Sequence, residues 1–159
     1  MVPHTDPAFA LEAMLVDDVG AIDAIRAGEA LADVKVVRGF IDRYEAAVTT
    51  RLQQLYEQGA SAPAADMHTR NGGVSAREAR RKERRAAALD RAPSVADALA
   101  AGAIGAEHAD ALANTTSRLD DDVKASFFEH DPDLARDAAR MTPEEFAKNC
   151  RDMIRLLER

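Results

Sequence analysis

Apolar residues recur every three or four positions along residues 29–58, the longest periodic stretch of the chain. They are Leu31, Val34, Val37, Ile41, Tyr44, Val48, Leu52 and Leu55. Such intervals keep side chains on one face of an α-helix. The pattern predicts one long helix that ends before Gly59 and extends roughly 44 Å at about 1.5 Å per residue. A helix this long with a narrow apolar stripe usually lies along other helices or pairs with a second copy of itself.

Local signals for helix ends divide the rest of the chain. Asp6-Pro7 predicts a helix start, with the helix running to about Val16. Asp17 or Asp18 can cap a second short helix that ends near Gly28. Residues 59–73 combine Gly, Ser, Pro and Asn, which is loop chemistry, and they predict a linker.

The second half of the chain is punctuated by caps and breakers at short intervals. Ser75 and Glu78 form a capping box that predicts a helix to about Asp90. After Pro93, Ser94 is expected to cap a helix that Gly102 closes. Further helices are predicted over residues 106–116 and 121–129, after Asp131-Pro132, and from the capping box Thr142-Pro143-Glu144-Glu145 to the end.

Strand signals are almost absent, so the predicted fold is all-α, with a long N-terminal helix followed by a compact cluster of short helices. We divide the chain into three parts. Residues 1–58 are an N-terminal helical arm with the long helix, residues 59–73 are a linker, and residues 74–159 are a C-terminal helical cluster with a basic helix.

Composition supports a globular protein of 159 residues, with 47% hydrophobic and 31% charged residues. Only 4% are aromatic, so much of the apolar content is alanine, which buries little area, and partner chains can complete such a core. The single cysteine, Cys150, excludes an internal disulfide. The first residues lack the features of a signal peptide, and no apolar run approaches ~18 residues. We therefore expect a cytoplasmic protein with no membrane partner.

Candidate catalytic or metal-binding residues are few. The histidines His4, His68, His108 and His130 have no partner at metal-ligand spacing. Cys150 shares a helix face with Phe146 and Met153, which favours a buried small side chain over a reactive thiol. We therefore predict no catalytic residues, no metal, no cofactor and no enzymatic activity for this chain alone.

Positive charge is concentrated in residues 77–85 of a chain whose net charge is −7. The six bases there are Arg77, Arg80, Arg81, Lys82, Arg84 and Arg85. Two acids, Glu78 and Glu83, leave a local charge of +4, so the remainder carries about −11. Arginine-rich helices suit phosphate groups, so these six residues are the predicted nucleic-acid contacts. The alternative is that acidic neighbours in the same fold neutralise them.

The stretch Val74–Thr116 also carries a family resemblance. Its pattern runs Val-Ser-Ala-Arg-Glu-Ala-Arg-Arg, then Leu89-Asp90-Arg91-Ala92-Pro93, then Val95–Ile104 and Glu107-His108-Ala109. It resembles the actinobacterial domain of unknown function of the mycobacterial thirteen-E-twelve repeat proteins, which typically precedes an HNH endonuclease module. The likeness covers about Leu31 to Leu157. The histidines, asparagine and cysteines of the nuclease module have no counterpart in this chain.

These observations predict a nucleic-acid-binding helical domain of an HNH-endonuclease-type protein, acting on DNA before RNA and without the nuclease module. The rival prediction is an oligomerisation or protein-interaction module. In that case the basic helix forms ion pairs, and a homodimer forms through the long helix.

Overall fold

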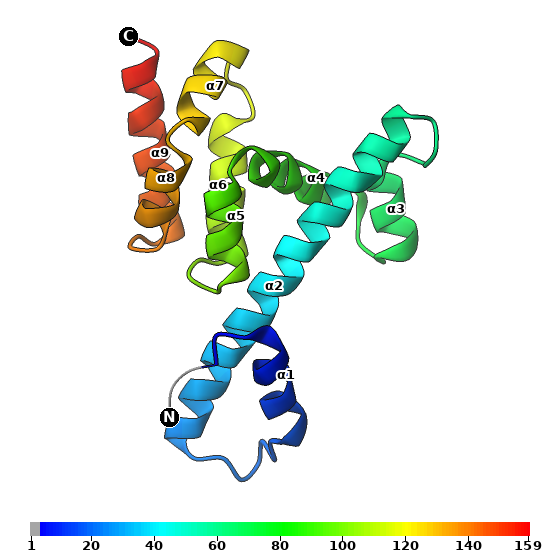
Figure 1. The fold of residues 1–159 in the computed structure, drawn as a ribbon, viewed down its shortest axis with the longest axis vertical. Helices are drawn as coiled ribbons and strands as arrows, with labels where there is room; N and C mark the ends of the chain where they lie inside the picture. Colours follow the sequence, from blue (N-terminus) through cyan, green and yellow to red (C-terminus); the bar gives the residue numbers. More distant parts are fainter. Residues whose placement is uncertain (1–3) are drawn as a thin grey trace.

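The computed structural model describes residues 4–159, and within that range it contains nine helices and no strand (Figure 1). This confirms the predicted all-α class. The helices are α1 (Pro7–Val16), α2 (Ala24–Glu57), α3 (Ala64–Asn71), α4 (Ala76–Arg91), α5 (Pro93–Ala100), α6 (Ala106–Thr116), α7 (Asp121–Phe128), α8 (Asp131–Ala138) and α9 (Pro143–Leu157).

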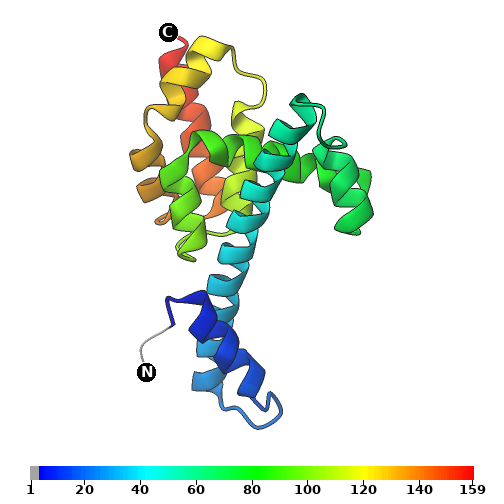
Figure 2. The same cartoon turned by 45° about the vertical axis from the view of Figure 1, so that its right-hand side comes forward.

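The long helix α2 is the axis on which the other parts are arranged. Helix α1 lies beside its N-terminal part, and α4 and α5 pack against its middle and C-terminal parts. The cluster α5–α9 and the short helix α3 lie on opposite sides of α2 in both views (Figures 1 and 2). Helix α4 crosses α2 and therefore connects the cluster with α3.

The hydrophobic core lies in the C-terminal cluster. Its largest fully buried side chains include Leu99, Leu112, Phe127 and Phe146, whereas α2 contributes Ala46 to it. Cys150 is buried in the same core, and that burial raises the pKa of Cys150 to about 12. The thiol is therefore a packing group, as its place on the apolar face of the last helix predicts.

Close contact between α2 and α5 depends on two glycines. A side chain at Gly39 would bring its Cβ to 2.1 Å from the Leu99 carbonyl oxygen, so the backbones touch at this point. Gly102 follows α5 with φ +73°, and Ala103 N–H donates to Ala98 O at 3.0 Å, which closes the helix as predicted. Gly102 also lies against Val36, so this helix end is part of the α2 contact.

The predicted short helix between Asp17 and Gly28 is wrong. Residues 17–23 form the connection between α1 and α2, and α2 begins at Ala24, where Asp23 accepts a hydrogen bond from Arg26 N–H at 2.8 Å. Arg26 Nε also donates to Asp17 at 3.1 Å, which fixes the connection against the helix. Gly28 lies inside α2, because an isolated glycine lowers helix stability without ending the helix.

The segment 59–73, predicted as a loop, contains the helix α3. Ala64 and His68 are buried, and Ala65 N–H donates to Glu83 of α4 at 2.9 Å. His68 Nε2 lies 2.8 Å from Thr49 Oγ1 of α2, whose hydroxyl donates to Glu45 O. These contacts join α3 to α2 and α4. They are tertiary contacts, and eight residues are too few to show a clear helical periodicity in the sequence.

The start of α5 is capped from a distant helix. Ser94 is not the cap that the sequence predicts, because Ser94 N–H and Val95 N–H both donate to the Asp131 carboxylate, at 2.8 and 3.1 Å. Asp131 belongs to α8 and is only 6% exposed. It therefore joins α5 and α8 through the helix end.

Replacing Asp131 with alanine should lower the free energy of unfolding by about 1–3 kcal/mol, because two buried N–H groups lose their acceptor. Urea unfolding followed by circular dichroism measures the change. Asp133→Ala is the matched control, since half of the Asp133 side chain is exposed and it pairs with Arg136 of the same helix. Its expected effect is within about 0.5 kcal/mol. Equal losses for the two variants would contradict the capping role of Asp131.

Candidate nucleic-acid interface on helix α4

Helix α4 carries the predicted basic residues, and its start is fixed locally. The Ser75 hydroxyl accepts a hydrogen bond from Glu78 N–H at 3.2 Å, as the capping pattern predicts. With 100° between successive residues, the bases fall on two faces of the helix. We call the face toward α2 and α6 the inner face and the opposite one the outer face.

Arg85 lies on the inner face and is only 5% exposed. Its Nε and Nη2 donate to the two oxygens of Asp110 of α6, at 2.8 and 2.9 Å, and its Nη1 lies 3.9 Å from Asp42 of α2. Burial lowers the pKa of Arg85, but Asp110 and Asp42 outweigh that effect and raise it overall. Burial likewise raises the pKa of Asp42, and Arg85 opposes that shift.

Two further predicted bases are engaged by carboxylates. Lys82 Nζ lies 2.6 Å from Glu45 Oε1 of α2, and Arg81 Nη2 lies 2.7 Å from Glu78 Oε2. The hydrogen bond from Arg81 lowers the pKa of Glu78. Arg81 keeps half of its side chain exposed, whereas Lys82 is largely covered.

These contacts separate two of the six predicted phosphate-binding residues, Lys82 and Arg85, from the others. Arg85 cannot reach a phosphate, because its guanidinium is buried in a bidentate ion pair. Lys82 is likewise committed to Glu45. A count of charges along the helix could not distinguish these two residues from the others, since their partners come from α2 and α6.

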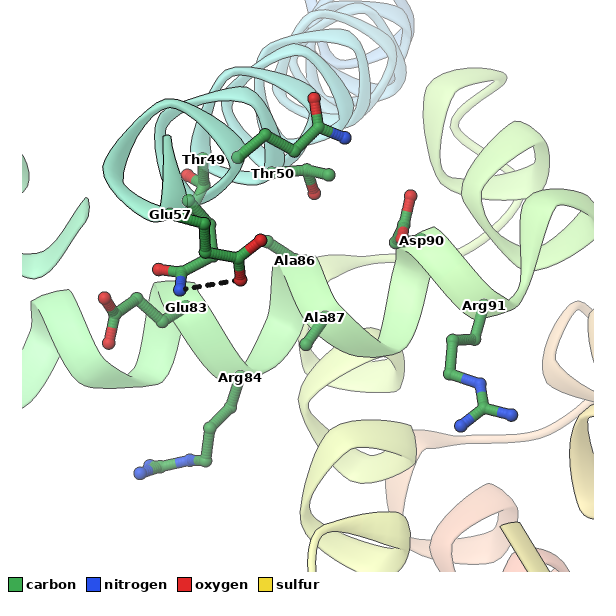
Figure 3. A pocket seen from close by; sticks show the side chains of 11 residues that line it. Thr49, Thr50, Glu57, Glu83, Arg84, Ala86, Ala87, Asp90 and Arg91 are labelled. Carbon is green, nitrogen blue, oxygen red and sulfur yellow. Dashed lines mark hydrogen bonds between the residues drawn. The ribbon is translucent and has the colours of Figure 1, made fainter. Parts of the chain in front are cut away.

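The outer face carries a row of arginines that remains available. Its members, Arg77, Arg80, Arg84 and Arg91, recur at intervals of three, four and seven residues, and all four are exposed. None of them forms an ion pair with a carboxylate in the described part of the chain, residues 4–159. Arg84 and Arg91 project from α4 on the side away from α2 (Figure 3). We call these four residues the outer arginine row.

A groove of about 300 Å³ continues the outer arginine row onto neighbouring helices. Arg84, Arg91 and Lys124 contribute cations to its lining, and Thr116 and Ser117 contribute hydroxyl groups. No lining residue is acidic. The guanidinium of Arg91 lies 5.1 Å from the centre of the Phe128 ring, which holds it at the groove. Three cations in a groove without a carboxylate suit an anionic ligand.

The groove between α2 and α4 has the opposite character. It measures about 580 Å³, and its lining includes the carboxylates of Glu57, Glu83 and Asp90 (Figure 3). Arg84 and Arg91 of the outer arginine row also line it. Gln53 donates to Glu57 at 3.3 Å within it. Three carboxylates against two arginines leave this groove with a net negative lining, which disfavours phosphate, so the candidate interface is the groove that contains Lys124.

The histidines act as structural connectors. His108 Nδ1 accepts from Gly105 N–H at 3.2 Å, and its Nε2 lies 2.8 Å from Met141 O, so both ring nitrogens are used by the backbone. His4 Nδ1 lies 2.9 Å from the buried Asp33, which also accepts from Arg26. Among residues 4–159, no three His, Cys, Asp or Glu side chains gather where they could hold a metal ion.

Comparison with protein families assigns the chain to a family. A family model described as "Domain of unknown function (DUF222)" matches residues 28–159, which is most of the chain. The chain belongs to this family. The match confirms the resemblance to a domain of unknown function, and the DUF222 region includes all of α4 and the groove beside it. Comparison with curated proteins gave no match, and comparison with solved structures gave none.

Two residues of the candidate interface in this DUF222 domain are not among the six predicted from the sequence. Arg91 lies seven residues after Arg84 and therefore on the same helix face, a spacing from which it could have been found. Lys124 comes from α7, and only the folded structure brings it to α4. Elsewhere, no helix of the described chain combines the length and apolarity that crossing a bilayer requires.

Proposed function

We propose that this chain binds nucleic acid, DNA in the first place, through phosphate contacts made by the outer arginine row and Lys124. One observation carries the proposal: four exposed arginines share one face of α4 and have no carboxylate partner in residues 4–159. The internal ion-pair alternative accounts for Lys82 and Arg85, whose carboxylate partners are present. It leaves the outer row unexplained.

The charge distribution supports a focused contact. A protein of net charge −7 is repelled by DNA on average, so attraction must come from a local patch. From Arg77 to Arg91 the row extends about 21 Å along the helix axis. Duplex DNA carries about one charge per 1.7 Å of axis, so several phosphates lie within that reach. Phosphate contacts carry no sequence information, so we expect affinity with little sequence preference from this face.

A paired substitution tests the outer arginine row. Arg80→Ser with Arg84→Ser should weaken binding to a labelled duplex in dilute buffer by about tenfold or more, because two phosphate contacts are lost. Fluorescence anisotropy measures the change in Kd. The matched control is Arg136→Ser with Arg155→Ser, which removes the same charge from exposed positions on α8 and α9. An equal loss in the control, or no binding by the unaltered chain, would overturn the proposal.

We further propose that the domain serves an HNH-endonuclease-type protein and does not cleave DNA by itself. The first part rests on the resemblance of residues 74–116 to domains that precede an HNH endonuclease module. The second part rests on the sequence analysis, which predicts no catalytic residue and no metal for this chain alone. Hydrolysis of DNA requires a general base or a metal-activated water.

Supercoiled plasmid incubated with the purified chain and Mg²⁺, Mn²⁺ or Zn²⁺ should therefore remain intact. Gel electrophoresis of the plasmid is the measurement. Metal-dependent nicking that coelutes with the chain would contradict this expectation.

A further inference from the structure

Large apolar side chains are exposed along α1 and α2. Among the described residues, all the exposed large apolar side chains except Leu156 lie between positions 9 and 56, on α1, on α2 or in their connection. Val16 is 83% exposed and Tyr44 is 64% exposed. A surface of this size on a charged protein indicates an interaction site.

Helix α1 is the clearest part of this surface. Its sequence, PAFALEAMLV, has Glu12 as its single charged residue, so it is apolar around its whole circumference. A helix of that kind is expected to be covered on all sides. Yet α2 covers only one side of it, where Ala10 is buried, and Phe9 and Leu15 face outward.

The middle of α2 carries a second part of the surface. Val34, Val37, Ile41, Tyr44 and Val48 recur at alternating intervals of three and four, the spacing of a coiled-coil seam. This seam lies on the side of α2 opposite the residues that pack on α4 and α5, such as Gly39 and Thr49. Ile41, Tyr44 and Val48 are 53%, 64% and 38% exposed, and Val34 and Val37 are half-buried, so the seam is uncovered from Ile41 to Val48.

We propose that a second copy of this chain covers the seam, with the two α2 helices antiparallel. In this arrangement Ile41 packs against Tyr44 of the second copy, and Val37 packs against Val48. The pairing is repeated by the twofold symmetry, as a homodimer interface requires. The long helix then has apolar partners on both of its faces.

Charges beside the seam select the antiparallel direction. Arg38 and Glu45 flank it on the same side, and antiparallel packing brings each Arg38 beside Glu45 of the second copy. Glu45 Oε1 also accepts from Lys82, and a carboxylate can accept several hydrogen bonds. Parallel helices would instead place Arg51 against Arg51 in the seam, which is repulsive.

The same arrangement also buries the exposed side of α1. Because α1 lies beside the N-terminal part of its own α2, antiparallel packing places it near the C-terminal part of the second α2. Leu52, Leu55 and Tyr56 lie there, and Tyr56 is 47% exposed. Two α1–α2 hairpins then form a four-helix bundle.

Disulfide trapping tests both the contact and its direction. Val37→Cys and Val48→Cys chains, carrying tags of different size, are mixed in equal amounts and oxidised gently. The mixture should give a cross-linked pair containing one chain of each kind, and either variant alone should give little. The native Cys150 thiol does not interfere, because it is buried. Cross-linking within each variant alone, as parallel helices produce, or no cross-link in the mixture, would overturn the proposal.

The mass of the protein in solution provides an independent test of the dimer. The unaltered chain should have twice its 17.2 kDa mass in light scattering at micromolar concentration. Ile41→Glu should return it to the monomer while the helical content stays unchanged in circular dichroism. Leu156→Glu is the matched control, because Leu156 is 67% exposed but lies on α9, and it should leave the mass unchanged. A monomeric unaltered chain, or a dimer that persists in Ile41→Glu, would contradict the proposed seam.

Discussion

Gly39→Ala is expected to lower the free energy of unfolding by about 3 kcal/mol or more. The added Cβ would lie 2.1 Å from the Leu99 carbonyl oxygen, so the backbones of α2 and α5 must separate. Overpacking of a close contact typically costs ~1–3 kcal/mol, and here the obstacle is main chain rather than a movable side chain. Urea unfolding followed by circular dichroism gives the value.

Gly28→Ala is the control that makes this result specific. Gly28 lies in the same helix, and a Cβ there meets nothing within 4 Å. Alanine in a helix interior is favoured over glycine by about 0.5–1 kcal/mol, so this variant should be stabilised. The two substitutions are chemically identical and should have opposite signs. Stabilisation of both would mean that α2 and α5 do not touch at Gly39.

Arg85→Ala should lower the free energy of unfolding by about 3–5 kcal/mol, because it leaves the carboxylates of Asp110 and Asp42 without their cation. The neighbouring substitution Arg84→Ala is the control. Arg84 is exposed and unpaired among the described residues, so its effect on stability should stay within about 0.5 kcal/mol. Thermal and urea unfolding of the two variants separate the inner face of α4 from its outer face.

The loss in free energy of unfolding caused by Arg85→Ala should also depend on pH. Burial already raises the pKa of Asp42, and Arg85 opposes that shift, so removing the guanidinium raises this pKa further. A carboxyl group whose pKa is raised by folding destabilises the folded state when it is ionised, at pH above its folded pKa. The deficit should therefore be largest near neutral pH and shrink as the pH falls. A deficit that does not change with pH would point to lost packing instead.

The sequence predicts those helix ends that depend on neighbouring residues. Ser75 and Thr142 are caps in the structure as in the prediction, because a capping side chain bonds to a backbone group three residues away. The cap of α5 could not be predicted in this way, since Asp131 lies 37 positions from Ser94. Helix α3 was missed for the same reason, because its contacts with Glu83 and Thr49 are tertiary.

The sequence predicts the six bases of α4 as one set of contacts, and the structure divides them between two faces of the helix. Helical phase alone separates Arg77, Arg80 and Arg84 from Lys82 and Arg85. It does not show which group faces inward, because that depends on where Glu45 and Asp110 lie after folding. The uncovered seam of α2 follows more directly from the sequence, since its three-four spacing is a local pattern.

The salt dependence of DNA binding tests the proposed function most directly. If the outer arginine row and Lys124 neutralise about five phosphates, the logarithm of the association constant should fall with the logarithm of salt concentration at a slope of about −4.5. Arg80→Ser with Arg84→Ser should reduce the slope to about −2.7, since three contacts remain. Anisotropy titrations of one labelled duplex at several salt concentrations measure both slopes. A slope near zero for the unaltered chain, or a slope that the double substitution leaves unchanged, would contradict binding through the outer face of α4.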